Sequence, residues 1–128
     1  MERETSEHFQ TADRNRDLAR TLLHAPTSIG PTAASLEWAA VIAFYAAVHY
    51  VNGYLRERYQ LEPVDHAERS RYVRSDPLLR RCASAYSRLR DEGYRCRYHR
   101  AYRLMPQQAH GLINVALANV ESVVRSAI

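Results

Sequence analysis

The sequence predicts an all-α protein, a bundle of four or five helices. Apolar side chains recur at spacings of three and four residues in several segments, whereas no segment shows the alternation typical of a strand. Pro26, Gly30, Pro31, Pro63 and Pro106 fall between these segments, where helices end. The 128 residues suffice for one domain with its own core. We divide it into an N-terminal helix and loop (1–30) and a bundle core (31–128).

The first two helices are predicted over residues 5–24 and about 33–59. The intervening APTSIGPT (25–32) forms a loop, which either caps the second helix or tethers the first. The second helix is apolar nearly all round, so it lies at the centre of the domain or is covered by a partner chain. Because it has too few polar positions for an exposed face, we expect a homodimer that uses parts of the second or last helix.

The third helix begins at His66, behind an Asp65-x-x-Glu68 capping box. A fourth begins at Pro77, and the last spans about 107–127. Cys82 and Cys96 fall on the apolar stripe of the fourth helix, which favours core packing over reactivity. Their spacing matches no metal motif, so we expect no metal or cofactor, and reduced thiols in a cytoplasmic protein.

His49 and Asn52 lie among apolar neighbours on the second helix. The favoured interpretation is a core histidine satisfied by an internal hydrogen bond. A role as a ligand or catalytic group remains the alternative. Both residues are therefore predicted to be structural.

The stretch RCRYHRAYR (95–103) is rich in arginine and tyrosine. With 100° per residue, the phase of the fourth helix places Arg97 near the edge of the apolar stripe, and Arg95 away from it. We expect Arg97 to be partly buried and, with Tyr98, structural. Arg95, Arg100 and Tyr102 become candidates for contact with RNA.

The formal net charge is +4, and the sequence contains 18 arginines but no lysine. This bias reflects either the base composition of the genome or bidentate recognition of phosphate. The N-terminal segment has no apolar run, so a signal peptide is not expected. The most apolar segment (36–51) is shorter than a membrane span and contains Glu37 and His49, so no membrane partner is expected.

Three segments resemble the HEPN family (higher eukaryotes and prokaryotes nucleotide-binding): FYAAVHYVNGYL (44–55), HAERSRYV (66–73) and YSRLRDEGYRCRY (86–98). His66 and Arg69 open the second of these, and His66 is taken as structural. The resemblance implies a helical bundle that usually dimerises, in some cases within a toxin–antitoxin or defence system. Many members are metal-independent ribonucleases with an Arg-x4–6-His motif near the last helix.

Arg103 and His110 have six residues between them and match that motif, so the resemblance makes them the catalytic pair. Arginine would stabilise the phosphate charge, and histidine would move protons near neutral pH. Arg3 and His8 also match, in a segment expected to be frayed, and Leu104 and Pro106 depart from the family pattern. Three hypotheses follow: a non-catalytic RNA-associated module, an active ribonuclease, or a bundle that binds only a protein partner.

Overall fold

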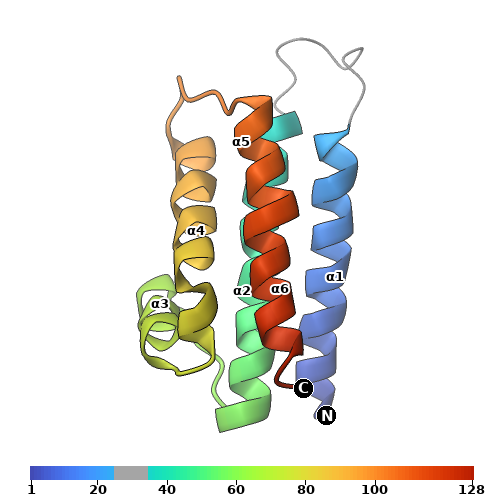
Figure 1. The fold of residues 1–128 in the computed structure, drawn as a ribbon, viewed down its shortest axis with the longest axis vertical. Helices are drawn as coiled ribbons and strands as arrows, with labels where there is room; N and C mark the ends of the chain where they lie inside the picture. Colours follow the sequence, from blue (N-terminus) through green and yellow to red (C-terminus); the bar gives the residue numbers. More distant parts are fainter. Residues whose placement is uncertain (25–34) are drawn as a thin grey trace.

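A computed structural model describes residues 1–24 and 35–128, and every regular element within these ranges is helical. Figure 1 shows α1, α2 and the last helix running side by side, with α3 and α4 against one side of them. The all-α prediction is confirmed, while the predicted 25–32 loop lies outside the described residues. The elements are α1 (Arg3–Leu23), α2 (Ser35–Tyr59), α3 (His66–Ser75), the 3-10 turn η2 (Leu79–Cys82), α4 (Ala83–Tyr98), α5 (Pro106–Gly111), the π-helical η3 (Leu112–Leu117) and α6 (Ala118–Arg125).

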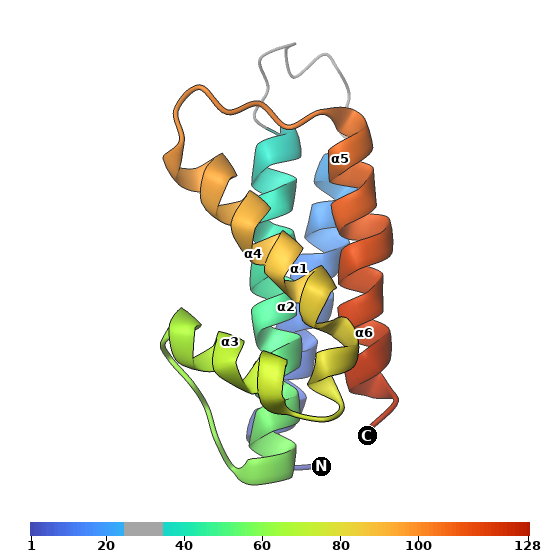
Figure 2. The same cartoon turned by 60° about the vertical axis from the view of Figure 1, so that its left-hand side comes forward.

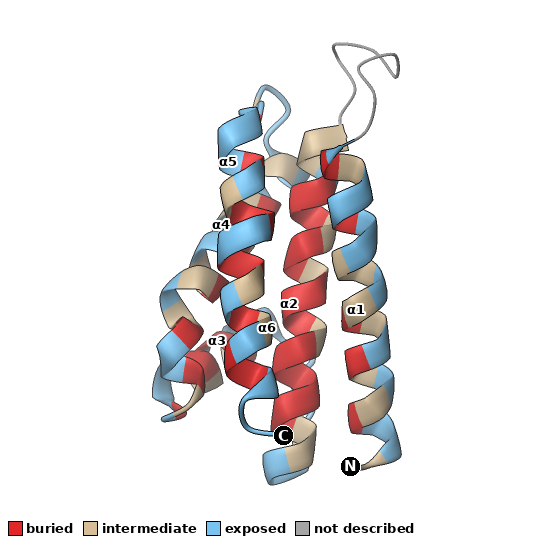
Figure 3. Cartoon of the chain, turned by 45° about the vertical axis from the view of Figure 1, so that its right-hand side comes forward, coloured by how far each residue is buried: buried red, intermediate tan, exposed pale blue. Residues whose placement is uncertain are grey.

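The central helix is α2, which is buried along most of its length (Figure 3). The chain's own helices cover it, since α1, α4 and the last helix all pack against it. Its apolar surface therefore does not by itself require a second subunit. α1 belongs to the same core, to which it contributes Phe9, Ala12, Ala19 and Leu23. None of the helices in the described ranges is long and apolar enough to cross a membrane.

Two aspartates define the ends of α3. The Asp65 carboxylate accepts a hydrogen bond from the Ala67 N–H over 2.7 Å, as expected of the predicted N-cap. Asp76 follows the helix and accepts from the N–H groups of Leu78 and Leu79 over 2.9 and 3.0 Å. A 3-10 turn forms there, and the backbone leaves helical geometry at Cys82 (φ −118°, ψ 15°). The fourth helix therefore begins at Ala83, and its predicted start at Pro77 was wrong.

The last helix is continuous but not uniform. The predicted stripe is buried, and it includes Leu112, Ile113, Val120 and Val124. Between α5 and α6, however, the backbone widens into the π-helical segment η3. Nothing in the residue pattern distinguishes such a segment from an ordinary helical turn, since the local apolar spacing is the same.

Both cysteines are free thiols. Cys82 is buried and Cys96 is partly buried, in agreement with the predicted core stripe. Burial raises the pKa of each thiol to about 11. Because the thiolate is the reactive form, both side chains act as apolar packing groups at neutral pH.

Candidate functional site

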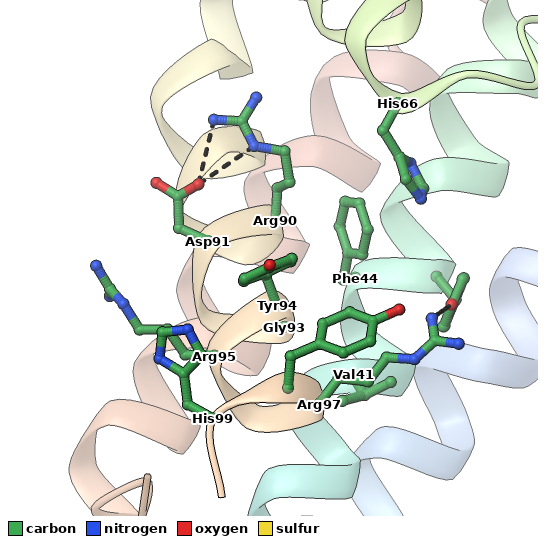
Figure 4. Close-up of a pocket in the computed structure, with 12 residues that line it drawn as sticks. Val41, Phe44, His66, Arg90, Asp91, Gly93, Tyr94, Arg95, Arg97 and His99 are labelled. Atoms are coloured by element: carbon green, nitrogen blue, oxygen red, sulfur yellow. Dashed lines mark hydrogen bonds and ion pairs between the residues drawn. The ribbon is translucent and has the colours of Figure 1, made fainter.

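A hollow lined by three helices lies beside the point where α4 crosses α2. Figure 2 shows that this crossing is oblique. The two helices are in close contact at Gly93, where an added Cβ would lie 3.1 Å from the Phe44 Cβ. Beyond that contact the last turn of α4 diverges from α2, as Figure 2 shows. The hollow here, called the groove below, has a volume of about 520 Å³. Figure 4 shows its lining, which comes from α2, α3 and α4: Val41, Phe44, Tyr45, His66, Arg90, Asp91, Gly93, Tyr94, Arg95, Arg97, Tyr98 and His99.

Aromatic rings form much of this groove. Phe44 and Tyr45 come from α2, with ring centroids 5.9 Å apart. Tyr94 and Tyr98 come from successive turns of α4, with centroids 4.8 Å apart, and each is more than half exposed. Exposed rings at this spacing offer flat surfaces on which unpaired bases can stack.

The arginines of the groove differ in their partners. Arg90 pairs with Asp91 and donates to Ser70, and Arg95 pairs with Glu92. Arg97 donates to the Tyr45 hydroxyl, and its guanidinium lies 5.9 and 5.1 Å from the ring centroids of Tyr45 and Tyr98. No carboxylate within the described residues pairs with Arg97. Its charge is therefore available to an anionic ligand.

The expected burial of Arg97 was wrong, because the side chain is exposed. Its helical phase was inferred correctly, since it follows the buried Tyr86 and Gly93 along one side of α4. In the last turn α4 diverges from α2 (Figure 2), so Arg97 meets α2 at the Tyr45 hydroxyl on the protein surface and not in the core. Tyr98 is exposed for the same reason, at 56%. Both line the groove instead of the core.

Behind the groove lies the buried guanidinium of Arg69, which is 3% exposed. Its Nε donates to Asn52 Oδ1 over 2.9 Å, its Nη2 to the Pro63 carbonyl over 2.5 Å, and its Nη1 lies 2.9 Å from His66 Nδ1. Asn52 is thus a buried acceptor on α2. His66 stands between this charge and the groove, and its ring packs 5.4 Å from that of Phe44.

A second histidine cluster joins α1 to α2. His49 Nδ1 lies 3.0 Å from His8 Nδ1, and His8 Nε2 lies 2.5 Å from a Glu62 oxygen. Burial, followed by the proximity of His8, lowers the pKa of His49. These contacts hold the N-terminal segment around His8, which was expected to be frayed, against α2. Within the described ranges, no group of three or more histidine, cysteine or acidic side chains is arranged to hold a metal ion.

Arg103 and His110 contact different groups within one chain, and no hydrogen bond joins the two side chains. The Arg103 guanidinium turns back onto the carbonyls of Arg100 and Tyr102, at 3.2 and 2.9 Å. His110 lies 3.4 Å from the Asn114 amide, with its ring 5.6 Å from that of His24. Both side chains are exposed. Arg103 borders a shallow hollow of about 140 Å³ next to the groove, and His110 does not line it.

The remaining RNA-contact candidates have different surroundings. Arg95 and Arg100 are exposed. Tyr102 is partly buried, and its hydroxyl donates to Glu92, a bond that raises its pKa to about 12. The neighbouring Leu104 is buried, and its N–H donates to Glu37 over 3.2 Å. Tyr102 thus anchors the segment after α4, and it also lines the hollow that Arg103 borders.

Sequence reasoning placed the candidate surface on α4 but missed the contributions of α2 and α3. His66 and Arg69 are three residues apart and share a helix face, which signals a contact between them. That their partners are Asn52 and Phe44 depends on how three helices pack. No periodicity along one helix reveals such a contact.

No protein-family model, no curated protein and no solved structure matches this chain. The class of the protein is therefore described from the fold and the groove alone. It is an all-α bundle with a groove lined by aromatic rings and arginines, in which no carboxylate of the described residues pairs with Arg97.

Proposed function

We propose that this chain is a non-catalytic HEPN-like module that binds single-stranded RNA through the groove between α2, α3 and α4. One observation carries the proposal. Four aromatic rings line the groove together with Arg97, whose charge no carboxylate balances in the described part of the chain. Rings and unpaired arginines are the combination that binds bases and phosphates.

A single strand fits this surface better than a duplex. Base stacking on an aromatic side chain contributes about 1–3 kcal/mol per base, but only when the base is unpaired. The exposed pair Tyr94 and Tyr98 offers two such surfaces. A hollow of about 520 Å³ is of the size that holds one small ligand, so we expect it to take one nucleotide of the strand. The net charge of +4 favours the encounter with RNA.

Binding without cleavage is favoured because the implied catalytic pair lies outside the groove. Arg103 and His110 share no hydrogen bond in the chain, and neither is among the groove residues. A metal-independent reaction needs a proton-transfer group and a stabilising charge at the same phosphate. One chain alone does not provide that arrangement.

The ribonuclease alternative therefore requires a homodimer. α2 and the last helix each leave a large apolar side chain exposed, namely Trp38 at 57% and Val115 at 65%. These are the helices from which we expect a dimer interface, and exposed apolar groups of this size favour association. A cytoplasmic toxin–antitoxin or defence role is proposed from the resemblance alone.

The test is fluorescence anisotropy with a labelled octauridylate, with the same strand annealed to its complement as a competitor. We expect Arg97→Ala to weaken binding about tenfold, because it removes a charge-assisted contact. Arg14→Ala is the matched control, since Arg14 is an exposed arginine on α1. Binding should weaken as salt rises. Equal affinity of the two variants for the strand would refute the proposed surface.

A further inference from the structure

We propose that His66 is a hydrogen-bond donor with a fixed tautomer which, together with Arg97, binds a phosphate group of the nucleotide in the groove. This inference rests on the RNA-binding function proposed above, and it assigns the phosphate to one end of the groove. The residues that carry it are His66, Arg69 and Arg97.

Arg69 determines which nitrogen of His66 carries the proton. A guanidinium can only donate hydrogen bonds, and Arg69 Nη1 lies 2.9 Å from His66 Nδ1. His66 Nδ1 must therefore accept, which leaves the proton of the neutral ring on Nε2. The ring lines the groove, so Nε2–H is the group that it offers to a ligand. This N–H can donate a hydrogen bond to a phosphate oxygen, but it cannot bind a group that is itself only a donor.

Arg69 also supplies a buried positive charge behind the groove. Its three acceptors are the Asn52 amide, the Pro63 carbonyl and the His66 ring, all of them neutral. Within the described residues no carboxylate pairs with it, although it is 3% exposed. A buried charge without an opposite charge is costly. A phosphate bound at His66 would reduce that cost, because it would place negative charge one side chain away.

The charges around His66 agree with an anion site. Burial, followed by Arg69, lowers the pKa of His66, and Arg90 and Arg97 on α4 act in the same direction. Asp65 opposes them from the first turn of α3, while the groove side of α2 contributes Phe44 and Tyr45. His66 is therefore neutral at pH 7, and the field at its ring is positive. A bound phosphate should raise the pKa of His66.

Two substitutions separate the two nitrogens of the ring. His66→Asn keeps an acceptor near Nδ1 for Arg69 but removes the donor in the groove. His66→Gln places an amide N–H near the position of Nε2. The probes are adenosine 5′-monophosphate and adenosine, which differ only in the phosphate, with binding followed by calorimetry. Octauridylate binding to the same samples tests the proposed function separately.

In the wild type we expect the monophosphate to bind at least about tenfold more tightly than adenosine, as one charge-assisted bond would give. His66→Asn should reduce that difference to the part that Arg97 contributes and leave adenosine binding unchanged, and His66→Gln should restore part of the loss. Equal binding of the two probes to the wild type, or equal loss of both in His66→Asn, would overturn the phosphate assignment. If octauridylate alone fails to bind, the RNA proposal fails while the phosphate site stands.

A measurement on the wild-type protein is independent of whether the variants fold. Two-bond proton–nitrogen correlation spectra of the imidazoles report the tautomer directly. We expect the Nε2–H form for His66 at neutral pH, and an upward shift of its titration midpoint when adenosine 5′-monophosphate is added. A His66 ring protonated on Nδ1, or a midpoint that the monophosphate leaves unchanged, would contradict the inference.

Discussion

Arg69 on α3 donates a hydrogen bond from Nε to Oδ1 of Asn52 on α2 over 2.9 Å, and both side chains are buried. This bond connects the buried charge behind the groove to the central helix. The amide offers an acceptor without a charge, so the guanidinium is positioned but not neutralised. The same geometry that stabilises the junction of α2 and α3 therefore keeps a positive charge behind the groove.

We expect Asn52→Ala to lower the free energy of unfolding by about 1–3 kcal/mol, because it leaves a buried guanidinium N–H without an acceptor. Urea denaturation measures this difference. Asn119→Ala is the control, since Asn119 is exposed on α6. An unchanged midpoint in Asn52→Ala would show that the bond does not stabilise the fold.

The lowered pKa of Asp76 predicts that the stability of the protein depends on pH. Burial raises its pKa, but hydrogen bonds from the Tyr59 hydroxyl, the Leu79 N–H and the Tyr54 hydroxyl outweigh burial and leave the pKa below 3.8. A lowered pKa in the folded state stabilises the protein above the pKa of the unfolded chain. That contribution is lost as the pH falls through the folded-state value.

We therefore expect Asp76→Asn to be less stable than the wild type at pH 7, and the two to converge at pH values below the folded-state pKa of Asp76. Asp13, whose pKa is also lowered, retains its own share of the acid sensitivity in both proteins. Urea unfolding at several pH values tests this. A stability difference that stays constant from neutral to strongly acidic pH would contradict the role assigned to the carboxylate.

The contact of Gly93 with Phe44 sets the separation of α4 from α2. A Cβ at Gly93 would lie 3.1 Å from the Phe44 Cβ, close to the α2 backbone, where little relief is available. We expect Gly93→Ala to destabilise the protein by about 1–3 kcal/mol through overpacking. Gly111→Ala is the matched control, because its Cβ would meet only the end of the exposed Arg88 side chain at 3.0 Å.

Gly111→Ala should be neutral or stabilising by up to about 1 kcal/mol, because alanine favours the helix more than glycine does. Thermal unfolding of both variants provides the comparison. Equal shifts in Tm would show that the proximity of Phe44 does not limit the position of α4.

The catalytic alternative makes its own prediction. If Arg103 and His110 from two chains formed a ribonuclease site, wild type would cut RNA in the presence of EDTA, and alanine at either position would stop it. We expect no cleavage by the wild type and unchanged strand binding by His110→Ala. Gel analysis of total RNA after incubation with each protein tests both statements. Cleavage that depends on both residues would overturn the non-catalytic proposal.

Much of the fold could be predicted from the sequence, because helical periodicity and capping are local. The start of α3 at His66 followed from Asp65, and the buried stripe of the last helix followed from its spacing. The start of α4 at Ala83 could not be predicted, because it depends on contacts of Asp76 with distant residues. The Asp76 carboxylate caps the turn before α4 and also accepts hydrogen bonds from the Tyr54 and Tyr59 hydroxyls.

The candidate site was predicted only in part. Helical phase placed Arg97 beside Tyr86 and Gly93, but its exposure depends on the divergence of α4 from α2. The residues that complete the groove, Phe44 and His66, come from two other helices. Their juxtaposition is a property of packing, which no single segment encodes.

The most direct test of the central claim is a titration of the 15N-labelled protein with octauridylate, followed by amide chemical shifts. The account predicts that the largest changes cluster at groove residues, above all Tyr94, Arg97 and Tyr98 on α4 and His66 on α3. It also predicts small changes at Arg14 and around His110. Changes centred on Arg103 and His110, or no changes at saturating RNA, would contradict it.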